Sequence, residues 1–242
     1  HRNQVDAILP QERSARRIIK EQISTIKPVF TELLDNLKNF GDDSYVSTFA
    51  APMSVLNKRI SASRRIAAQS YEIQRFNDIA ERLNISKNDV VLALCAGAIR
   101  RYLLSIDALP SKPLIAFVPM SLRTDNSVAG NQLSFVLANL GTHLDDPLSR
   151  IELIHRSMNN GKHRFRRMNQ AQVINYSVIS YAWEGINLAT GLFPKKQAFN
   201  LIISNVPGSE KPLYWNGARL QSLYPASIVF NGQAMNITLA SY

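Results

Sequence analysis

The sequence predicts an α/β (α+β) fold in which helices cover a mixed β-sheet. Three observations lead to this prediction. Apolar residues recur at helical spacing in several segments, runs of β-branched and aromatic residues lie between them, and some of these runs follow one another directly. Strands that alternate with helices favour parallel pairing, whereas consecutive strands favour antiparallel pairing, so the sheet should contain both kinds.

The first part of the chain, residues 1–45, is predicted to be a basic amphipathic helical linker. Its apolar residues recur near helical spacing until Pro28 interrupts them, and the pattern then resumes until Gly41. Such a helix can lie on another domain or on a lipid surface. The pattern changes past Asp43, so a second domain is expected over residues 46–242.

Beyond the linker, residues 65–73 are predicted to form a strand, and a short helix with Phe76 and Leu83 on one face should follow. The next helix should begin at Ser86–Asp89, because a hydroxyl and a carboxylate at this spacing satisfy free amide groups of the first turn. It should run to about Ser105. Its expected inner face holds Val91, Leu94, Cys95, Ala98 and Tyr102.

Residues 112–123 and 131–141 are predicted to form two strands joined by a loop. A helix should start at Pro147, a residue suited to the first helical position. Its expected inner face is formed by Leu148, Ile151, Ile154, His155 and Met158. Residues 173–193 are apolar over a membrane-spanning length, but Glu184 and several polar residues interrupt them, which favours a buried or tunnel-lining helix.

Three further strands are expected near the C-terminal end. The first covers residues 200–207, the second carries Tyr214 and Trp215 and ends at Asn216-Gly217, and the third covers residues 234–242. The first of them breaks at Pro207-Gly208 and carries two polar residues, Ser204 and Asn205, where a core strand would have apolar ones. Turn chemistry ahead of a Pro-Gly pair is one explanation of these two residues. Polar atoms that serve a site are the other.

The net charge of +10 favours an acidic partner, which could be nucleic acid, an anionic membrane surface or a phosphorylated small molecule. The excess is concentrated between Leu153 and Trp183, where no Asp or Glu occurs. The clustered basic residues of this stretch are Arg156, Lys162, Arg164, Arg166 and Arg167. A solvated basic face is an equally good interpretation.

The residues by themselves contain no complete catalytic motif. There is no nucleotide-binding glycine loop, no nucleophile elbow and no zinc spacing, so neither a metal nor a cofactor is expected. The single cysteine, Cys95, falls within a helix core and is expected to be inert. His155 falls on an apolar helix face and is predicted to be a hydrogen-bonded core histidine.

Five sequence blocks resemble the bacterial wax ester synthase/acyl-CoA:diacylglycerol acyltransferase family, in the same order. They are KNDVVLALCAGAIRRYL, which is similar to the Asn-Asp motif of the family, LPSKPLIAFVPMSLR, NLIISNVPG, PLYWNGARL and YPASIVFNGQAMNITLASY. The resemblance covers about residues 47–242. It implies one half of a two-domain CoA-dependent acyltransferase fold, with the active site in a channel between the domains.

The catalytic His-His-x-x-x-Asp-Gly motif of the family does not occur in the sequence, which has no His-His pair. The resemblance therefore implies that residues 46–242 are a C-terminal acyltransferase domain, truncated at its C-terminal end. The general-base histidine would lie in a missing N-terminal half, and the isolated chain would be inactive. The implied reaction transfers a fatty acyl group from acyl-CoA to a long-chain alcohol or diacylglycerol, which forms wax esters or triacylglycerols.

On this hypothesis the catalytic candidates, as donors to the thioester oxyanion, are Asn88, Ser204 and Asn205. Helix capping explains Asn88 and Asp89 equally well. The substrate-binding candidates are Asp89, Gly185, Pro207, Gly208, Arg164, Arg166 and Arg167. The basic residues would hold CoA phosphates or anionic lipid, and Gly185 would leave space for an acyl chain.

The expected location is cytoplasmic, with peripheral contact to an anionic membrane or a lipid inclusion such as a droplet. A non-catalytic lipid-binding or scaffold domain of the same fold is the alternative, since the chain itself lacks the catalytic motif. A nucleic-acid-binding module would need aromatic residues among the basic ones, and only Phe165 lies there, so nucleic acid is not an expected partner.

Overall fold

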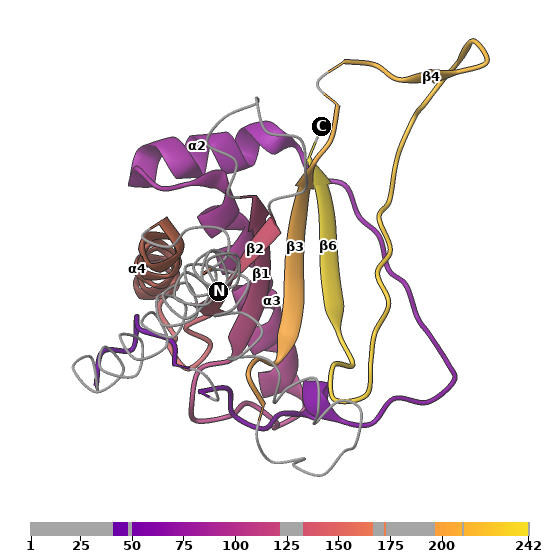
Figure 1. Cartoon of the computed structure of the whole chain (residues 1–242). Helices are drawn as coiled ribbons and strands as arrows, with labels where there is room; N and C mark the ends of the chain where they lie inside the picture. Colours follow the sequence, from indigo (N-terminus) through magenta and orange to yellow (C-terminus); the bar gives the residue numbers. More distant parts are fainter. Residues whose placement is uncertain are drawn as a thin grey trace, which may run out of the picture.

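The computed structural model describes residues 41–47, 50–121, 133–166, 172, 197–209 and 211–241. The predicted linker therefore lies almost entirely outside the described residues, as does the apolar segment 173–193 with Gly185. The described part contains a four-stranded sheet, three α-helices and a separate two-stranded hairpin (Figure 1).

The sheet has the strand order β2-β1-β3-β6 and combines both kinds of pairing. β1 (Ile115–Ser121) and β2 (Leu133–Asn139) are antiparallel, whereas β3 (Leu201–Pro207) runs parallel to β1 and to β6 (Asn236–Ser241). The antiparallel pair is consecutive in sequence, and a helix, α4 (Pro147–Arg166), precedes β3. The predicted α/β class and the mixed sheet are therefore confirmed.

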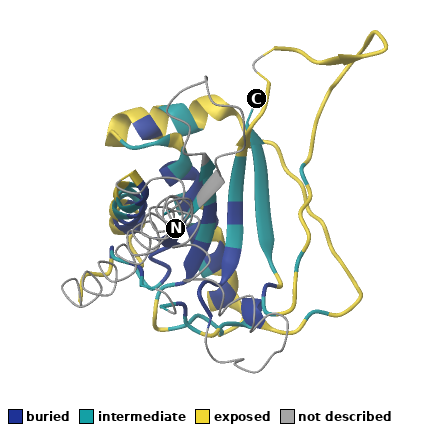
Figure 2. Ribbon diagram, in the orientation of Figure 1, coloured by how far each residue is buried: buried dark blue, intermediate teal, exposed yellow. Residues whose placement is uncertain are grey.

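Both faces of the sheet are buried in its central part, because successive residues of a strand point to opposite sides. One face shares a core with α3 (Lys87–Ser105) and α4, and its buried strand residues are Ala116, Val118, Val136, Ala138, Leu201 and Ile203. The other face packs against Val46, Ala51 and Phe199. Figure 2 shows that burial is deepest along the central strands and only intermediate along β6.

Local sequence explains where the helices begin and end. Ser86 and Asp89 form the predicted capping box of α3, and the Asp146 carboxylate accepts a hydrogen bond from the Ser149 amide at the start of α4 (2.7 Å). α2 (Ile73–Leu83) ends at Asn84, whose φ of +52° is a left-handed conformation that asparagine tolerates well. The predicted starts of α3 and α4 are thus confirmed.

The predicted inner faces of α3 and α4 are wrong at four positions. Leu94 and Tyr102 are 48% and 52% exposed, Leu148 is 58% exposed, and Ala98 is also exposed. α3 carries apolar residues around most of its circumference, so periodicity alone does not select the face that is buried. The fully buried positions of α3 are instead Leu92, Ala96 and Leu103.

Two extended arms project from the sheet and are exposed over most of their length (Figures 1 and 2). The first arm, residues 58–72, contains most of the strand predicted over 65–73. That prediction is wrong, because no strand of the described chain pairs with this segment and it has no regular structure. Its Ile66 is 78% exposed.

The second arm, residues 211–232, carries an exposed hairpin in place of the single strand predicted to end at Asn216-Gly217. β4 (Tyr214–Trp215) and β5 (Ala218–Arg219) pair around Asn216-Gly217, and both residues of this turn have positive φ. Such a turn matches the twist of a two-residue hairpin. Trp215 is 83% exposed at the hairpin.

Buried amide side chains fix both arms at their bases. Nδ2 of Asn57 donates to Oε1 of Gln197 (2.5 Å) and to the carbonyl of Gly232 (2.9 Å). Asn200 donates from Nδ2 to Oδ1 of Asn57 (2.7 Å), and its Oδ1 accepts from the amide of Ile115 (2.8 Å). These bonds connect the start of the first arm and the end of the second arm to β1.

Candidate functional site

The first turn of α3 holds Asn88 and Asp89 of the predicted site. Oγ of Ser86 accepts a hydrogen bond from the Asp89 amide (3.2 Å), and Oδ2 of Asp89 accepts one from the Ser86 amide (3.1 Å). Asp89 is only 1% exposed. Asn88 is half-buried, and its side chain makes no hydrogen bond within the part of the chain that the structure describes.

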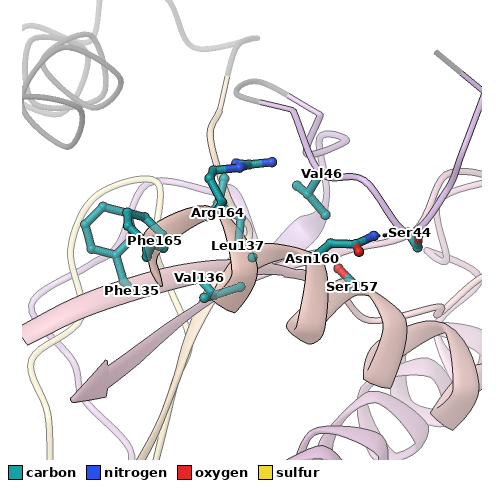
Figure 3. A pocket seen from close by; sticks show the side chains of 10 residues that line it. Ser44, Val46, Phe135, Val136, Leu137, Ser157, Asn160, Arg164 and Phe165 are labelled. Carbon is teal, nitrogen blue, oxygen red and sulfur yellow. Dashed lines mark hydrogen bonds between the residues drawn. The ribbon is translucent and has the colours of Figure 1, made fainter. Parts of the chain in front are cut away.

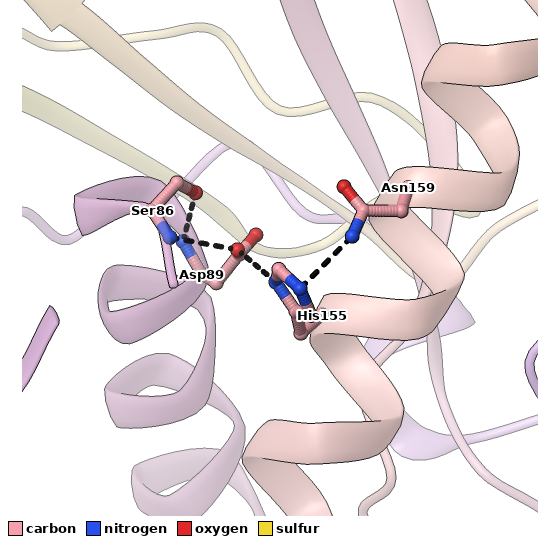
Figure 4. Close-up of polar contacts among 4 residues, drawn as sticks. All are labelled: Ser86, Asp89, His155 and Asn159. Carbon is pink, nitrogen blue, oxygen red and sulfur yellow. Dashed lines mark hydrogen bonds and ion pairs between the residues drawn. The ribbon is translucent and has the colours of Figure 1, made fainter. Parts of the chain in front are cut away.

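α4 contributes His155 to the same place (Figure 4). Nδ1 of His155 lies 2.8 Å from Oδ2 of Asp89, and Nε2 lies 2.9 Å from Nδ2 of Asn159, four residues further along α4. A neutral imidazole with its proton on Nδ1 satisfies both contacts, since it donates to the carboxylate and accepts from the amide. The predicted hydrogen bonding of His155 is confirmed, but its side chain is 31% exposed, so it is half-buried and not a core residue.

The second predicted set lies at the end of β3. Ser204 and Asn205 are half-buried, and they lie opposite Thr238 and Leu239 of β6. Oδ1 of Asn205 is buried and accepts no hydrogen bond among the described residues. The strand continues through Pro207, so these polar residues belong to a paired strand and not to a turn.

The predicted elbow, Pro207 and Gly208, lies at the edge of the described core. Both residues are exposed, and the amide of Gly208 still donates to the carbonyl of Ser241 (2.7 Å), which continues the pairing with β6. Beyond it the chain enters the second arm. Pro207 and Gly208 therefore mark the exit from the sheet.

Only some of the candidate site residues form a hydrogen-bonded contact with a distant part of the described chain. Asp89 is brought to His155, a contact between positions 66 apart in sequence. No hydrogen bond of the described chain joins Asn88 to Ser204 or Asn205. Neither the partner role of Asn159 nor the Asp89–His155 contact was predictable from motifs, although the spacing of His155 and Asn159 places them on one helix face.

The basic residues lie along the second half of α4. Arg156 and Arg166 are exposed, whereas Lys162 and Arg164 are half-buried, and Arg167 lies outside the described residues. The Arg164 guanidinium lies 4.7 Å from the centroid of the Tyr45 ring, a cation–π contact. Cations near a helix C-terminus also interact favourably with the helix dipole, so part of this cluster has a structural explanation.

A small cavity lies beside these residues, between α4, β2 and the segment around Ser44 (Figure 3). Its lining includes Phe135, Ser157 and Arg164. Its volume is about 10 Å³, which is about the minimum for one water molecule. The cavity is therefore too small to be an acyl channel.

Three further observations on the described residues concern the thiol, metal-ligating side chains and the length of apolar helices. Burial raises the pKa of the Cys95 thiol to about 11, so it stays protonated near neutral pH, in agreement with the predicted inert thiol. The described part of the chain holds no group of three or more metal-ligating side chains. Among its helices, none is long and apolar enough to cross a bilayer.

Two sequence profiles of one family match the chain. The wax ester synthase/diacylglycerol acyltransferase catalytic domain matches residues 3–91, and the WS/DGAT C-terminal domain matches residues 129–242. The first match includes Asn88 and Asp89, and the second includes Ser204 and Asn205. Because residues 3–91 match the catalytic domain, the expectation that the catalytic half is missing from this chain is not supported.

Individual relatives agree with the profiles. The chain is 55% identical over 226 residues to the O-acyltransferase WSD of Acinetobacter baylyi. The aligned region covers 93% of this chain and 49% of that relative. The solved structure of the wax ester synthase/diacylglycerol acyltransferase from Marinobacter aquaeolei VT8 matches with a TM-score of 0.72 and 44% identity, over 79% of this chain and 44% of that one. The chain spans about half the length of the relatives it matches. It belongs to the wax ester synthase/diacylglycerol acyltransferase family.

Proposed function

We propose that the chain is part of an acyl-CoA-dependent O-acyltransferase that forms wax esters or triacylglycerols. The acceptor is a long-chain alcohol or a diacylglycerol. The observation that carries the proposal is the match of residues 3–91 and 129–242 to the two domain profiles of this one family. The names of the bacterial relatives, an O-acyltransferase and a wax ester synthase/diacylglycerol acyltransferase, support it.

In the proposed reaction, the hydroxyl oxygen of the acceptor attacks the thioester carbonyl carbon while a histidine removes its proton. The carbon–sulfur bond then breaks, and the same proton goes to the CoA sulfur. The His-His-x-x-x-Asp-Gly motif does not occur among the 242 residues. We therefore assign the general base to a segment that this chain does not carry, although part of the catalytic domain is present.

We assign Asn88 to the stabilisation of the oxyanion that forms on the thioester. Its amide is half-buried in the first turn of α3 and makes no hydrogen bond to another described residue. The positive end of the helix dipole favours negative charge at this position. Ser204 and Asn205 are assigned supporting polar contacts from the end of β3.

We assign binding roles to the two arms and to the basic residues of α4. The arms would contact the remaining part of the enzyme, and the basic residues would contact phosphate groups. Exposed apolar side chains on the arms, such as Ile66 and Trp215, would pack against the remaining part of the enzyme. Arg156 and Arg166 are exposed cations that would hold the phosphates of CoA or anionic lipid headgroups. Contact with a membrane or lipid inclusion is part of the same proposal.

The test is an ester-formation assay with acyl-CoA and a long-chain alcohol. The chain is measured alone, with a separately produced segment that carries the His-His-x-x-x-Asp-Gly motif, and with the same segment after its histidines are replaced by alanine. Ester should form only with the intact segment. Ester formation by the chain alone would show that one of its own histidines acts as the general base. The absence of ester in every mixture would contradict the proposed function.

A further inference from the structure

The Asp89 carboxylate is a buried charge with few partners. It is 1% exposed, and Oδ1 accepts no hydrogen bond within the described chain. Oδ2 accepts from the Ser86 amide (3.1 Å) and contacts Nδ1 of His155 (2.8 Å). No described lysine or arginine lies within ion-pair distance of Asp89, and among the described side chains outside α3 the donor to its carboxylate is His155.

A capping carboxylate at a helix start usually remains in water, because an unpaired buried charge is strongly destabilising. Asp89 is instead buried, so water does not reach its carboxylate. α4 supplies a hydrogen-bond donor, His155, in place of water. The contact links the first turn of α3 to the middle of α4, at positions 66 apart in sequence. It therefore restricts how the start of α3, with Asn88 beside Asp89, lies relative to α4.

We propose that His155 is a positioning residue, which acts through Asp89 to hold Asn88 where it donates to the thioester oxyanion. The inference deepens the proposed function and rests on the role that function gives to Asn88. His155 itself touches no reacting atom. Asn159 completes the arrangement, since its Nδ2 donates to Nε2 and so keeps the imidazole proton on Nδ1, facing Asp89.

Two substitutions at His155 separate positioning from packing. His155→Asn keeps an N–H group near the position of Nδ1, the ring atom that faces Asp89, whereas His155→Leu keeps apolar volume and removes the donor. In the ester assay with the histidine-bearing segment, His155→Leu should lower kcat by about 10- to 100-fold, the size of effect that a misplaced catalytic group produces. His155→Asn should retain most of kcat, and KM for acyl-CoA should change little in both variants.

The matched control is His163→Leu, an exposed histidine on the same helix. It should leave kcat unchanged. A purely structural role for His155 predicts the opposite order, with His155→Leu at least as active as His155→Asn, and this order would overturn the proposal.

A double-mutant cycle tests whether the effect passes through Asn88. If it does, His155→Leu should cost little further activity in an Asn88→Ala background, because the group that it positions is already absent. If the fold-losses of kcat caused by the two substitutions multiply in the double variant, His155 acts independently of Asn88, and the proposal is overturned.

Nitrogen-15 NMR of the chain itself gives a readout that does not depend on catalysis. The His155 ring should show the Nδ1–H tautomer, and His155→Leu should shift the side-chain amide signals of Asn88 while His163→Leu does not. An Nε2–H tautomer, or unchanged Asn88 signals, would overturn the positioning role. If these signals behave as expected and no mixture forms ester, the proposed function fails while the structural link from His155 to Asn88 stands.

Discussion

Gly161 of α4 lies so close to Val136 of β2 that a Cβ built on Gly161 would overlap the methyl groups of Val136. Val136 is 1% exposed and is held within the core between α4 and the sheet. Val136 and Gly161 both line the small cavity of Figure 3, and its volume of about 10 Å³ is too small to take up a displaced valine side chain. Gly161 sets the distance between α4 and the sheet, and with it the position from which α4 presents His155.

Gly161→Ala is expected to lower the free energy of unfolding by about 1–3 kcal/mol, the usual effect of overpacking a core. The loss should appear although alanine favours a helix over glycine by about 1 kcal/mol. Gly97→Ala in α3 is the matched control, because its new Cβ would meet only the end of the Arg150 side chain, at 3.2 Å. Urea unfolding that finds both variants equally stable would contradict the close packing of Gly161.

The sequence alone predicted those features that depend only on residues close together in the chain. The capping box of Ser86 and Asp89 depends on four consecutive positions, and the pattern of the strands depends on neighbours two apart. The contact between Asp89 and His155 depends on how α3 packs against α4, which no local pattern specifies. The exposed first arm shows the converse, since its strand-like pattern finds no pairing partner within the described chain.

The buried thiol of Cys95 makes a prediction about pH. Its pKa is raised from 9.0 to about 11 by burial, so the folded protein keeps the thiol protonated where an unfolded chain would ionise it. Iodoacetamide at pH 8 should therefore label Cys95 only after denaturation. The thiol should also make stability fall as pH rises from about 9 to 11, and rapid labelling of the folded chain would contradict this account.

The exposed hairpin of the second arm provides a fluorescence test of the proposed contact with the remaining part of the enzyme. The chain has two tryptophans, so Trp183→Phe leaves Trp215 as the single reporter. Trp215 is 83% exposed, and its emission should lie at the long wavelengths of a solvated indole. Addition of the histidine-bearing segment should shift the emission to shorter wavelength and reduce acrylamide quenching. An unchanged spectrum in a mixture that forms ester would show that this hairpin does not pack against that segment.

Replacement of both Arg156 and Arg166 by glutamine should raise KM for acyl-CoA or weaken binding to anionic vesicles. Either effect should shrink at high salt, because exposed charges are screened within about 8–10 Å at physiological ionic strength. Arg82→Gln with Arg101→Gln, two exposed cations on α2 and α3, is a control with the same change in net charge. If the two double variants behave alike, the basic residues of α4 have no specific binding role.

The most direct measurement of the central claim is kcat of Asn88→Ala in the enzyme assembled with the histidine-bearing segment, taken beside its Tm. Lys87→Ala, at an exposed position of the same helical turn, is the control. If Asn88 donates to the oxyanion, kcat should fall by about 10- to 1,000-fold while Tm and the control change little. If kcat of the folded Asn88→Ala enzyme is intact and the only loss is about 0.5–2 kcal/mol of stability, Asn88 is a structural residue of the helix start and the proposed site is contradicted.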